Sequence, residues 1–203
     1  MISGGRGRMS ARKRLLLWLT ACAAVAQGAD APAGSEVFRI DPGETRTEFT
    51  VDHFWVATLR GHFSRARGTI VLDPEARAGS IDFTIDADSV DTGWAVRDDF
   101  LRGALMFDAS RFPEVHFRST SLAFDQRGLA GATGELTIHD VTRPVAVRVE
   151  RMDCLREGSR DDRCGVAVVS SVKRSDFGMT FGLPFVGDDI DLSFHLTAHR
   201  VSP

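Results

Sequence analysis

Tyrosine is absent from this chain of 203 residues, and lysine occurs only at Lys13 and Lys173. Cysteine is scarce as well, with three residues. Beyond the N-terminal segment, no apolar run approaches the roughly 20 residues that a membrane-spanning helix needs. The G-x-S-x-G and H-E-x-x-H motifs of serine hydrolases and zinc proteases are also missing. These absences argue against a transmembrane span in the body of the chain and against the commonest hydrolytic sites.

Charge is unevenly distributed along the chain. Residues 1–29 contain five basic residues and no acidic one, so the remainder has 20 basic and 28 acidic residues and a net charge of −8. Such an acidic domain is a poor match for nucleic acid or for an anionic membrane surface. We therefore expect neither as a partner.

The N-terminal segment has the order of features of an export signal. The basic stretch Arg12–Arg14 precedes the apolar stretch Leu15–Ala26, and small residues follow. This order predicts a signal peptide over residues 1–29, with cleavage after Ala26 or Ala29. The apolar run is too short to favour a transmembrane anchor.

Two details of this segment leave alternatives open. Met9 is an alternative start, because residues 1–8 add nothing to the signal. Cys22 follows Leu-Thr-Ala, which resembles the lipidation motif of bacterial lipoproteins. The expected location is therefore periplasmic or secreted, either as a soluble protein or as a lipoprotein through Cys22.

Cys154 and Cys164 are the cysteines of the main domain, and they bracket a polar, turn-like stretch. In an oxidising compartment, a disulfide bond that closes this loop is the simplest interpretation. It would contribute about 2–3 kcal/mol through loop entropy. Metal binding is the weaker alternative because no further cysteine or histidine lies at ligand spacing.

Alternation of apolar and polar residues dominates the chain from Phe38 onward. A period of two with one polar face indicates antiparallel strands around a single apolar interior. Turn-forming residues such as Asp41-Pro42-Gly43 separate the runs. The clearest runs have these apolar positions: Ile81, Phe83 and Ile85; Val145, Val147 and Val149; Ile190, Leu192, Phe194, Leu196 and Ala198. One all-β domain over residues 36–201, a barrel or a sandwich, is therefore expected.

A single stretch, Trp94 to Phe107, has a helical pattern. Asp91 or Thr92 is expected to cap it, and Trp94, Leu101 and Leu105 are expected to face inward. Between a barrel and a sandwich the alternation is neutral. All 14 phenylalanines lie beyond residue 29, and an interior with many Phe and no Tyr hydroxyl suits a dry cavity as well as a packed core.

Four blocks of sequence, in order, resemble the YceI-like family. The third, which contains Arg97-Asp98-Asp99-Phe100 and Phe112-Pro113-Glu114, is the most specific. The blocks are Phe38–Asp41 with Phe49–His53; Gly61–Phe63 with Gly68; Arg97–Ser119; and Gly134–Ile138 with Val141–Val145 and Arg174–Met179. His139-Asp140 departs from the pattern, because a glycine-containing turn is expected there.

This resemblance implies an eight-stranded antiparallel lipocalin-like barrel with one short helix. It also implies an exported protein without enzymatic activity that binds a polyisoprenoid lipid or an isoprenoid quinone in an apolar cavity, with no other cofactor. Two alternatives stay open: a structural or stress-protective barrel without a ligand, and an enzyme that uses the cavity for a small molecule. The sequence also leaves a homodimer open.

An isoprenoid chain offers almost no hydrogen bonds, so a site for it has to be lined by apolar side chains. The segment Phe177–Gly182 could form the mouth of such a tunnel or a simple bulge. The candidate wall residues, each of which could instead be plain core, are Phe54, Phe63, Phe83, Ile85, Phe107, Phe117, Phe177, Met179, Phe181 and Phe194.

Three polar residues are candidates for ligand contact. Arg97 and Arg174 could hold an anionic headgroup. They could equally pair with the acids beside them, Asp98 and Asp176. His53 is a candidate contact or a structural histidine. His195 and His199 lie too far apart on a strand to share a metal ion, so no metal site is expected. No catalytic residue is expected either, because the common catalytic motifs are missing.

Overall fold

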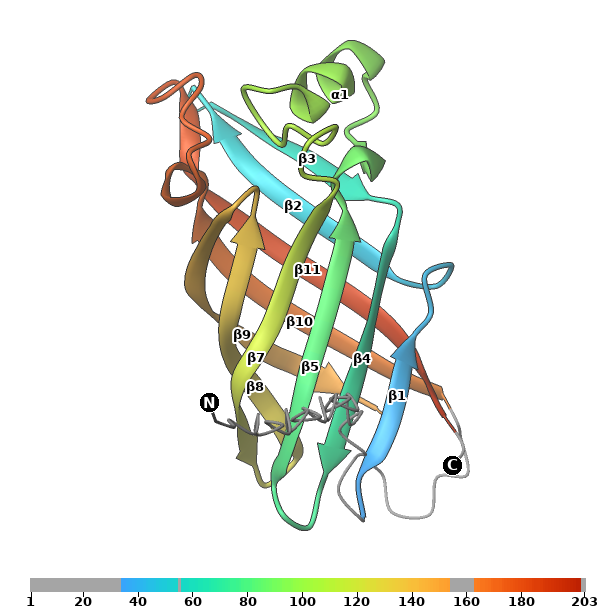
Figure 1. The fold of residues 1–203 in the computed structure, drawn as a ribbon. Coiled ribbons are helices and arrows are strands. Elements are labelled where there is room, and N and C mark those ends of the chain that lie inside the picture. Colours follow the sequence, from blue (N-terminus) through green and yellow to red (C-terminus); the bar gives the residue numbers. More distant parts are fainter. Residues whose placement is uncertain (1–33, 55, 154–162, 202–203) are drawn as a thin grey trace, which may run out of the picture. The chain divides into compact units, whose positions relative to one another are not determined.

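In the computed structural model, residues 34–54, 56–153 and 163–201 are described. The predicted signal peptide, Cys22 and Cys154 lie outside these ranges. Strands dominate the described residues, together with one α-helix and two short 3-10 helices (Figure 1). The elements are β1 (Glu36–Ile40), β2 (Arg46–His53), β3 (Ala57–Phe63), β4 (Ala66–Asp73), β5 (Ala78–Asp86), η1 (Ala87–Ser89), β6 (Val90–Asp91), α1 (Ala95–Arg102), β7 (Glu114–Asp125), β8 (Gly128–Ile138), β9 (Val141–Met152), β10 (Arg163–Lys173), η2 (Arg174–Phe177) and β11 (Val186–Arg200).

Eight strands form a closed antiparallel ring in the order β1-β4-β5-β7-β8-β9-β10-β11. The ring closes where β1 pairs with β11, with Ile40 opposite Ala198. The first half of β11 pairs instead with β2, and β3 and β6 follow β2 at that end. Thus β1 and β2 occupy successive stretches of the same edge of β11. The predicted eight-stranded barrel with one helix is confirmed.

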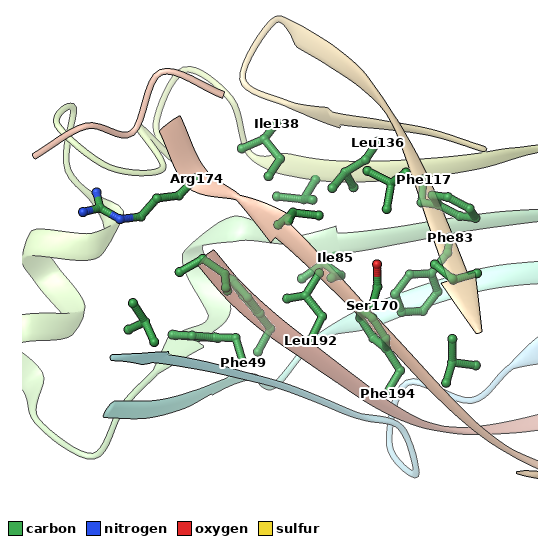
Figure 2. Close-up of a pocket in the computed structure, with 18 of the residues that line it drawn as sticks. Phe49, Phe83, Ile85, Phe117, Leu136, Ile138, Ser170, Arg174, Leu192 and Phe194 are labelled. Atoms are coloured by element: carbon green, nitrogen blue, oxygen red, sulfur yellow. The ribbon is translucent and has the colours of Figure 1, made fainter. Parts of the chain in front are cut away.

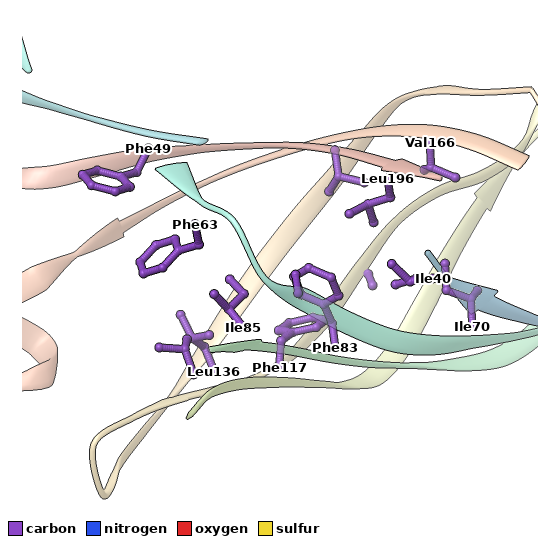
Figure 3. Packing of buried hydrophobic residues seen from close by; sticks show 14 of the residues in the cluster. Ile40, Phe49, Phe63, Ile70, Phe83, Ile85, Phe117, Leu136, Val166 and Leu196 are labelled. Atoms are coloured by element: carbon purple, nitrogen blue, oxygen red, sulfur yellow. The ribbon is translucent and has the colours of Figure 1, made fainter. Parts of the chain in front are cut away.

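One end of the barrel is tightly packed. Five nearly inaccessible side chains from β1, β4, β10 and β11 fill it: Phe38, Ile40, Leu72, Cys164 and Ala198. The apolar positions of the alternating runs face the same interior along the rest of the barrel (Figure 3). Burying this apolar surface is the main stabilising contribution to the fold.

Helix α1 is shorter than the predicted helix, because it ends at Arg102 with Gly103 as its C-cap residue. The predicted side-chain cap is wrong: Trp94 is the N-cap residue and makes no side-chain cap bond. Instead the buried carboxylate of Asp98 accepts hydrogen bonds from the backbone N–H (2.8 Å) and the hydroxyl of Thr92. Trp94 and Leu105 are exposed rather than inward, and only Leu101 of the three predicted residues reaches the interior.

A two-residue turn at His139 and Asp140 joins β8 to β9, since Ile138 pairs with Val141. His139 has a φ of 58°, in the left-handed region that glycine adopts most easily. Its Nδ1 lies 3.3 Å from the carbonyl oxygen of Phe177, and its ring packs on Phe112 at 5.3 Å between centroids. These contacts hold a histidine where glycine is expected. Among the described residues, no helix has both the length and the apolar character to cross a membrane.

Candidate functional site

An apolar cavity of about 310 Å³ occupies the barrel interior. It extends from residues of α1 and the segment before β11 down to Val166 and Leu196, just above the packed end. Phe100 and Phe181 line the cavity and are also 38% and 53% exposed, so the cavity reaches the surface at the α1 end. A space of this size is far larger than a single water molecule requires.

The wall is almost entirely hydrocarbon. Of the 37 described residues that line the cavity, four carry a polar side chain: His53, Arg97, Ser170 and Arg174. The hydroxyl of Ser170 donates to the carbonyl oxygen of Ala146 at 2.8 Å, so it is already satisfied. Such a wall offers few hydrogen bonds to a ligand. It can therefore bind a ligand mainly by burying the apolar surface of that ligand.

Aromatic rings lie at two levels along the cavity. Near α1, the ring of Phe63 packs on Phe49 and edge-on against Phe107, at 5.6 and 5.4 Å between centroids. Deeper in the barrel, Phe83 meets Phe194 edge-on at 5.7 Å, and Figure 2 shows both pointing into the cavity.

Two glycines make room for rings in this wall. A Cβ atom on Gly134 would lie 2.6 Å from Cζ of Phe117, and one on Gly61 would collide with the ring of Phe49. Both glycines belong to the blocks that indicate the family, and each leaves room for a ring beside a neighbouring strand.

The structure brings 11 of the 13 candidate ligand-binding residues into this wall. They are His53, Phe63, Phe83, Ile85, Arg97, Phe107, Phe117, Arg174, Met179, Phe181 and Phe194. Phe54 and Phe177 do not line the cavity. Phe54 is exposed at the tip between β2 and β3, whereas Phe177 is buried in η2 behind the wall.

Apart from Ile85, the aliphatic wall residues are absent from the predicted site. They include Leu136, Ile138, Val147, Val168 and Leu192, which alternate along β8 to β11. The alternation marks them as inward, but it does not tell which inward residues face empty space. Residue type points to the phenylalanines, but they make up only part of the wall.

The segment before β11 forms one side of the mouth. Gly178 and Gly182 have φ of 83° and 79°, so glycine supplies the left-handed conformation at both bends. Between them, Met179 and Phe181 turn into the cavity wall. The ring of Phe181 meets that of Phe100 on α1 at 4.9 Å, which joins this segment to the helix across the mouth.

Arg174 holds this segment in place. Its guanidinium donates to four carbonyl oxygens, those of Met179, Phe181, Val186 and Gly187, at 2.6 to 3.0 Å. The side chain is almost completely buried, and this burial lowers the pKa of Arg174. The alternative pairing with Asp176 is not observed. With its donors engaged by the backbone, Arg174 is a poor candidate for a headgroup contact.

Arg97 differs from Arg174. Its Nε donates to the hydroxyl of Thr92 at 2.7 Å, and one Nη donates to the carbonyl oxygen of Thr92 at 2.8 Å. The guanidinium also lies over the ring of Trp94. Its second Nη has no acceptor among the described residues, and the side chain is only half-buried at the mouth. The predicted pairing with Asp98 is absent, because that carboxylate serves Thr92.

Asp188 anchors the start of η2. Its carboxylate accepts from the N–H and the hydroxyl of Ser175 at 2.9 and 2.7 Å. Burial alone would raise the pKa of Asp188, but these hydrogen bonds outweigh it and hold the pKa below its ordinary value. The ionised form is therefore the one that stabilises the mouth segment.

Replacing Asp188 with alanine is expected to lower the free energy of unfolding by about 1–2 kcal/mol at pH 7. Because the folded-state pKa is depressed, this contribution is complete above the unfolded-state pKa of about 4 and disappears as the pH falls below it. Urea unfolding at pH 7 and pH 3 measures both. Asp189→Ala is the control, since Asp189 is exposed and paired with Lys173 at 2.9 Å. Equal losses in both variants would contradict the anchoring role.

Outside the cavity, two groups of described residues carry cysteine or histidine chemistry. Cys164 is buried at the packed end, and burial raises the pKa of its thiol to about 11, so the thiol is a weak nucleophile at neutral pH. Its predicted disulfide partner, Cys154, lies outside the described residues, so that bond stays a prediction. His199 lies 3.5 Å from Asp41, and Glu44 of the same cluster pairs with Arg163, so these carboxylates are already engaged.

Comparison with known proteins identifies this architecture. The YceI-like domain family matches residues 38–198. A UPF0312 protein of Pectobacterium atrosepticum is 32% identical over 89% of this chain and 94% of its own length. Protein YceI of Salmonella arizonae is 32% identical over 71% of this chain and 75% of its own length.

Solved structures have the same fold. BcnA of Burkholderia cenocepacia superimposes with a TM-score of 0.65 and 26% identity, over 78% of this chain and 98% of BcnA. A polyisoprenoid-binding domain from Saccharophagus degradans superimposes with a TM-score of 0.63 and 18% identity, over 81% of this chain and 98% of that domain. The sequence match, the ring of eight strands and the apolar cavity agree: the chain belongs to the YceI-like family.

Proposed function

We propose that this protein binds a polyisoprenoid lipid, or the tail of an isoprenoid quinone, in the cavity of its barrel. The observation that carries the proposal is the composition of the wall, in which four of 37 lining residues have polar side chains. Three of those four lie toward the mouth, because His53 ends β2 opposite Val186, Arg97 belongs to α1 and Arg174 begins η2. This leaves a long hydrocarbon interior for an apolar chain. The polyisoprenoid-binding domain of Saccharophagus degradans, which has the same fold, supports this choice of ligand.

A headgroup would then lie at the mouth beside Arg97. The second Nη of this side chain has no acceptor among the described residues, so it can donate to a phosphate or to a quinone carbonyl. Arg174 would act indirectly, by holding the loop that carries Met179 and Phe181. This assignment separates the two arginines that the sequence made equivalent.

We further propose that the protein is exported and acts without catalysis, in the carriage, storage or protection of its lipid. The basic and apolar segments of residues 1–29 support export to the periplasm or beyond. The absence of a polar cluster within the described cavity wall favours binding over chemistry. A barrel that works without a ligand, or an enzyme that uses the cavity, would be the alternative.

Purification without detergent, followed by lipid extraction and mass spectrometry, tests the ligand. We expect a stoichiometric isoprenoid that co-purifies with the folded protein. Titration of the delipidated protein with farnesol and with a long-chain isoprenoid quinone should restore binding, because the cavity recognises apolar surface. A protein that is isolated empty and takes up neither compound would contradict the proposal and favour a structural role.

A further inference from the structure

Large apolar side chains on the surface are concentrated around the mouth of the cavity. Of the nine that are exposed among the described residues, eight lie on three segments, and only Val201 lies elsewhere. Six of the eight do not line the cavity: Phe54 and Val56 at the tip between β2 and β3, Trp94, Val96 and Leu105 around α1, and Phe185 before β11. Together with Phe100 and Phe181, these residues are called the mouth rim.

Ring contacts join the three segments that carry the rim. Phe54 packs on Phe185 at 5.9 Å between ring centroids, which joins the β2–β3 tip to the segment before β11. Phe100 packs on Phe181 at 4.9 Å, which joins that segment to α1. Contiguous apolar surface of this kind on a soluble domain generally marks an interaction site.

The rim is also electrically neutral. Residues 178–187 contain no ionisable side chain. Across α1, Arg97 and Arg102 balance Asp98 and Asp99, and Asp99 pairs with Arg102 at 3.0 Å. The chain beyond residue 29 has a net charge of −8, so its field opposes approach to anionic surfaces. The surface that fits the rim is therefore apolar and uncharged.

We propose that the mouth rim docks on a bilayer of neutral or zwitterionic lipid, and that the isoprenoid chain passes between the bilayer and the cavity through this mouth. The proposal rests on the proposed function, because an isoprenoid chain is dissolved in membranes and scarcely in water. Docking would bring the cavity opening to the hydrocarbon boundary, so the chain would transfer without crossing water. A second copy of the protein fits the rim less well, since mouth-to-mouth contact would close both cavities.

Flotation with phosphatidylcholine vesicles tests the docking. The mature protein, without the predicted signal peptide whose own apolar run would bind vesicles, is compared with the triple variant Val56→Ser, Val96→Ser and Leu105→Ser. These three side chains are exposed and lie outside the cavity wall. We expect the vesicle partition coefficient of the variant to fall at least about tenfold, because each substitution removes apolar surface that would leave water. Val201→Ser, which removes an exposed apolar side chain away from the rim, should have no effect.

The position of Trp94 gives a second readout. In the wild-type protein its fluorescence should be quenched by phosphatidylcholine brominated on the acyl chains, and Trp94→Phe should remove that part of the quenching. Wild-type protein that does not float, or a triple variant that floats equally well, would overturn the docking. A dimer in sedimentation velocity that the triple variant loses, with no vesicle binding, would make a second copy the partner instead and would also overturn it.

Farnesol titration without vesicles separates this proposal from the proposed function. The triple variant should bind farnesol as the wild type does, because its substitutions lie outside the cavity wall. Loss of farnesol binding together with flotation in that variant would mean damage to the cavity and would overturn the rim as an independent surface. Wild-type protein that floats in a rim-dependent manner but binds no isoprenoid would sustain the docking surface and refute the cavity function.

Discussion

Replacing Ala132 with tryptophan is expected to weaken isoprenoid binding on the order of 100-fold while the barrel stays folded. Ala132 lies in the middle of β8, between Leu122 on β7 and Val147 on β9, and its side chain lines the cavity. An indole at this position would occupy space that the ligand needs. Because that space is empty rather than packed, we expect the melting temperature to stay equal or to rise.

The neighbouring position supplies the control. Thr133 is exposed on the outer face of the same strand, so Thr133→Trp adds the same side chain without entering the cavity. Binding is measured by titration of delipidated protein with an isoprenoid quinone, and folding by thermal unfolding. If the Ala132 variant is folded and binds as the wild type does, the ligand does not occupy the barrel interior. Equal weakening in both variants would likewise contradict the cavity as the site.

Replacing Arg174 with methionine is expected to lower the free energy of unfolding by about 3–5 kcal/mol. Methionine preserves much of the length and apolar stem but leaves the four carbonyl oxygens of the mouth segment without their donor. We expect hydrogen exchange to accelerate first in residues 178–187. Lys173→Met, next in sequence but exposed, should change stability by no more than about 0.5 kcal/mol.

The same variant decides between two roles for Arg174. If the guanidinium is structural, ligands with phosphate and quinone headgroups should lose affinity to the same extent. If the variant keeps wild-type stability and loses only the phosphate-headed ligand, Arg174 is a headgroup contact and the structural role is wrong. The carbonyl cage around the side chain favours the first outcome.

The fold was predictable because its main signal is local. A strand of period two places Ile190, Leu192 and Phe194 on one face whatever the rest of the chain does. The location of the cavity along that face is not local. It depends on where the packed end stops, and therefore on Phe38 and Leu72, which come from strands distant from β11 in the sequence.

For the helix and the arginines, too, the local pattern is predictable and the contacts with distant parts of the chain are not. The pattern of Trp94 to Leu105 is helical, but Gly103 ends the helix early. Of the three residues predicted to face inward, Leu101 alone lines the cavity. The acids beside Arg97 and Arg174 suggested ion pairs. The partners of Arg174 are carbonyl oxygens, which the bends at Gly178 and Gly182 bring close to its guanidinium. The spacing of residues in the sequence does not predict such contacts.

The seam between β1 and β11 has a consequence for how the chain folds. The ring is completed only by residues at opposite ends of the domain, such as Phe38 and Arg200. Pairings so distant in sequence make barrel closure slow compared with hairpin formation. During synthesis, β11 is the last strand to emerge, so the barrel cannot close before the whole domain is made. Until β11 is in place, one edge of β1 and one edge of β2 stay unpaired.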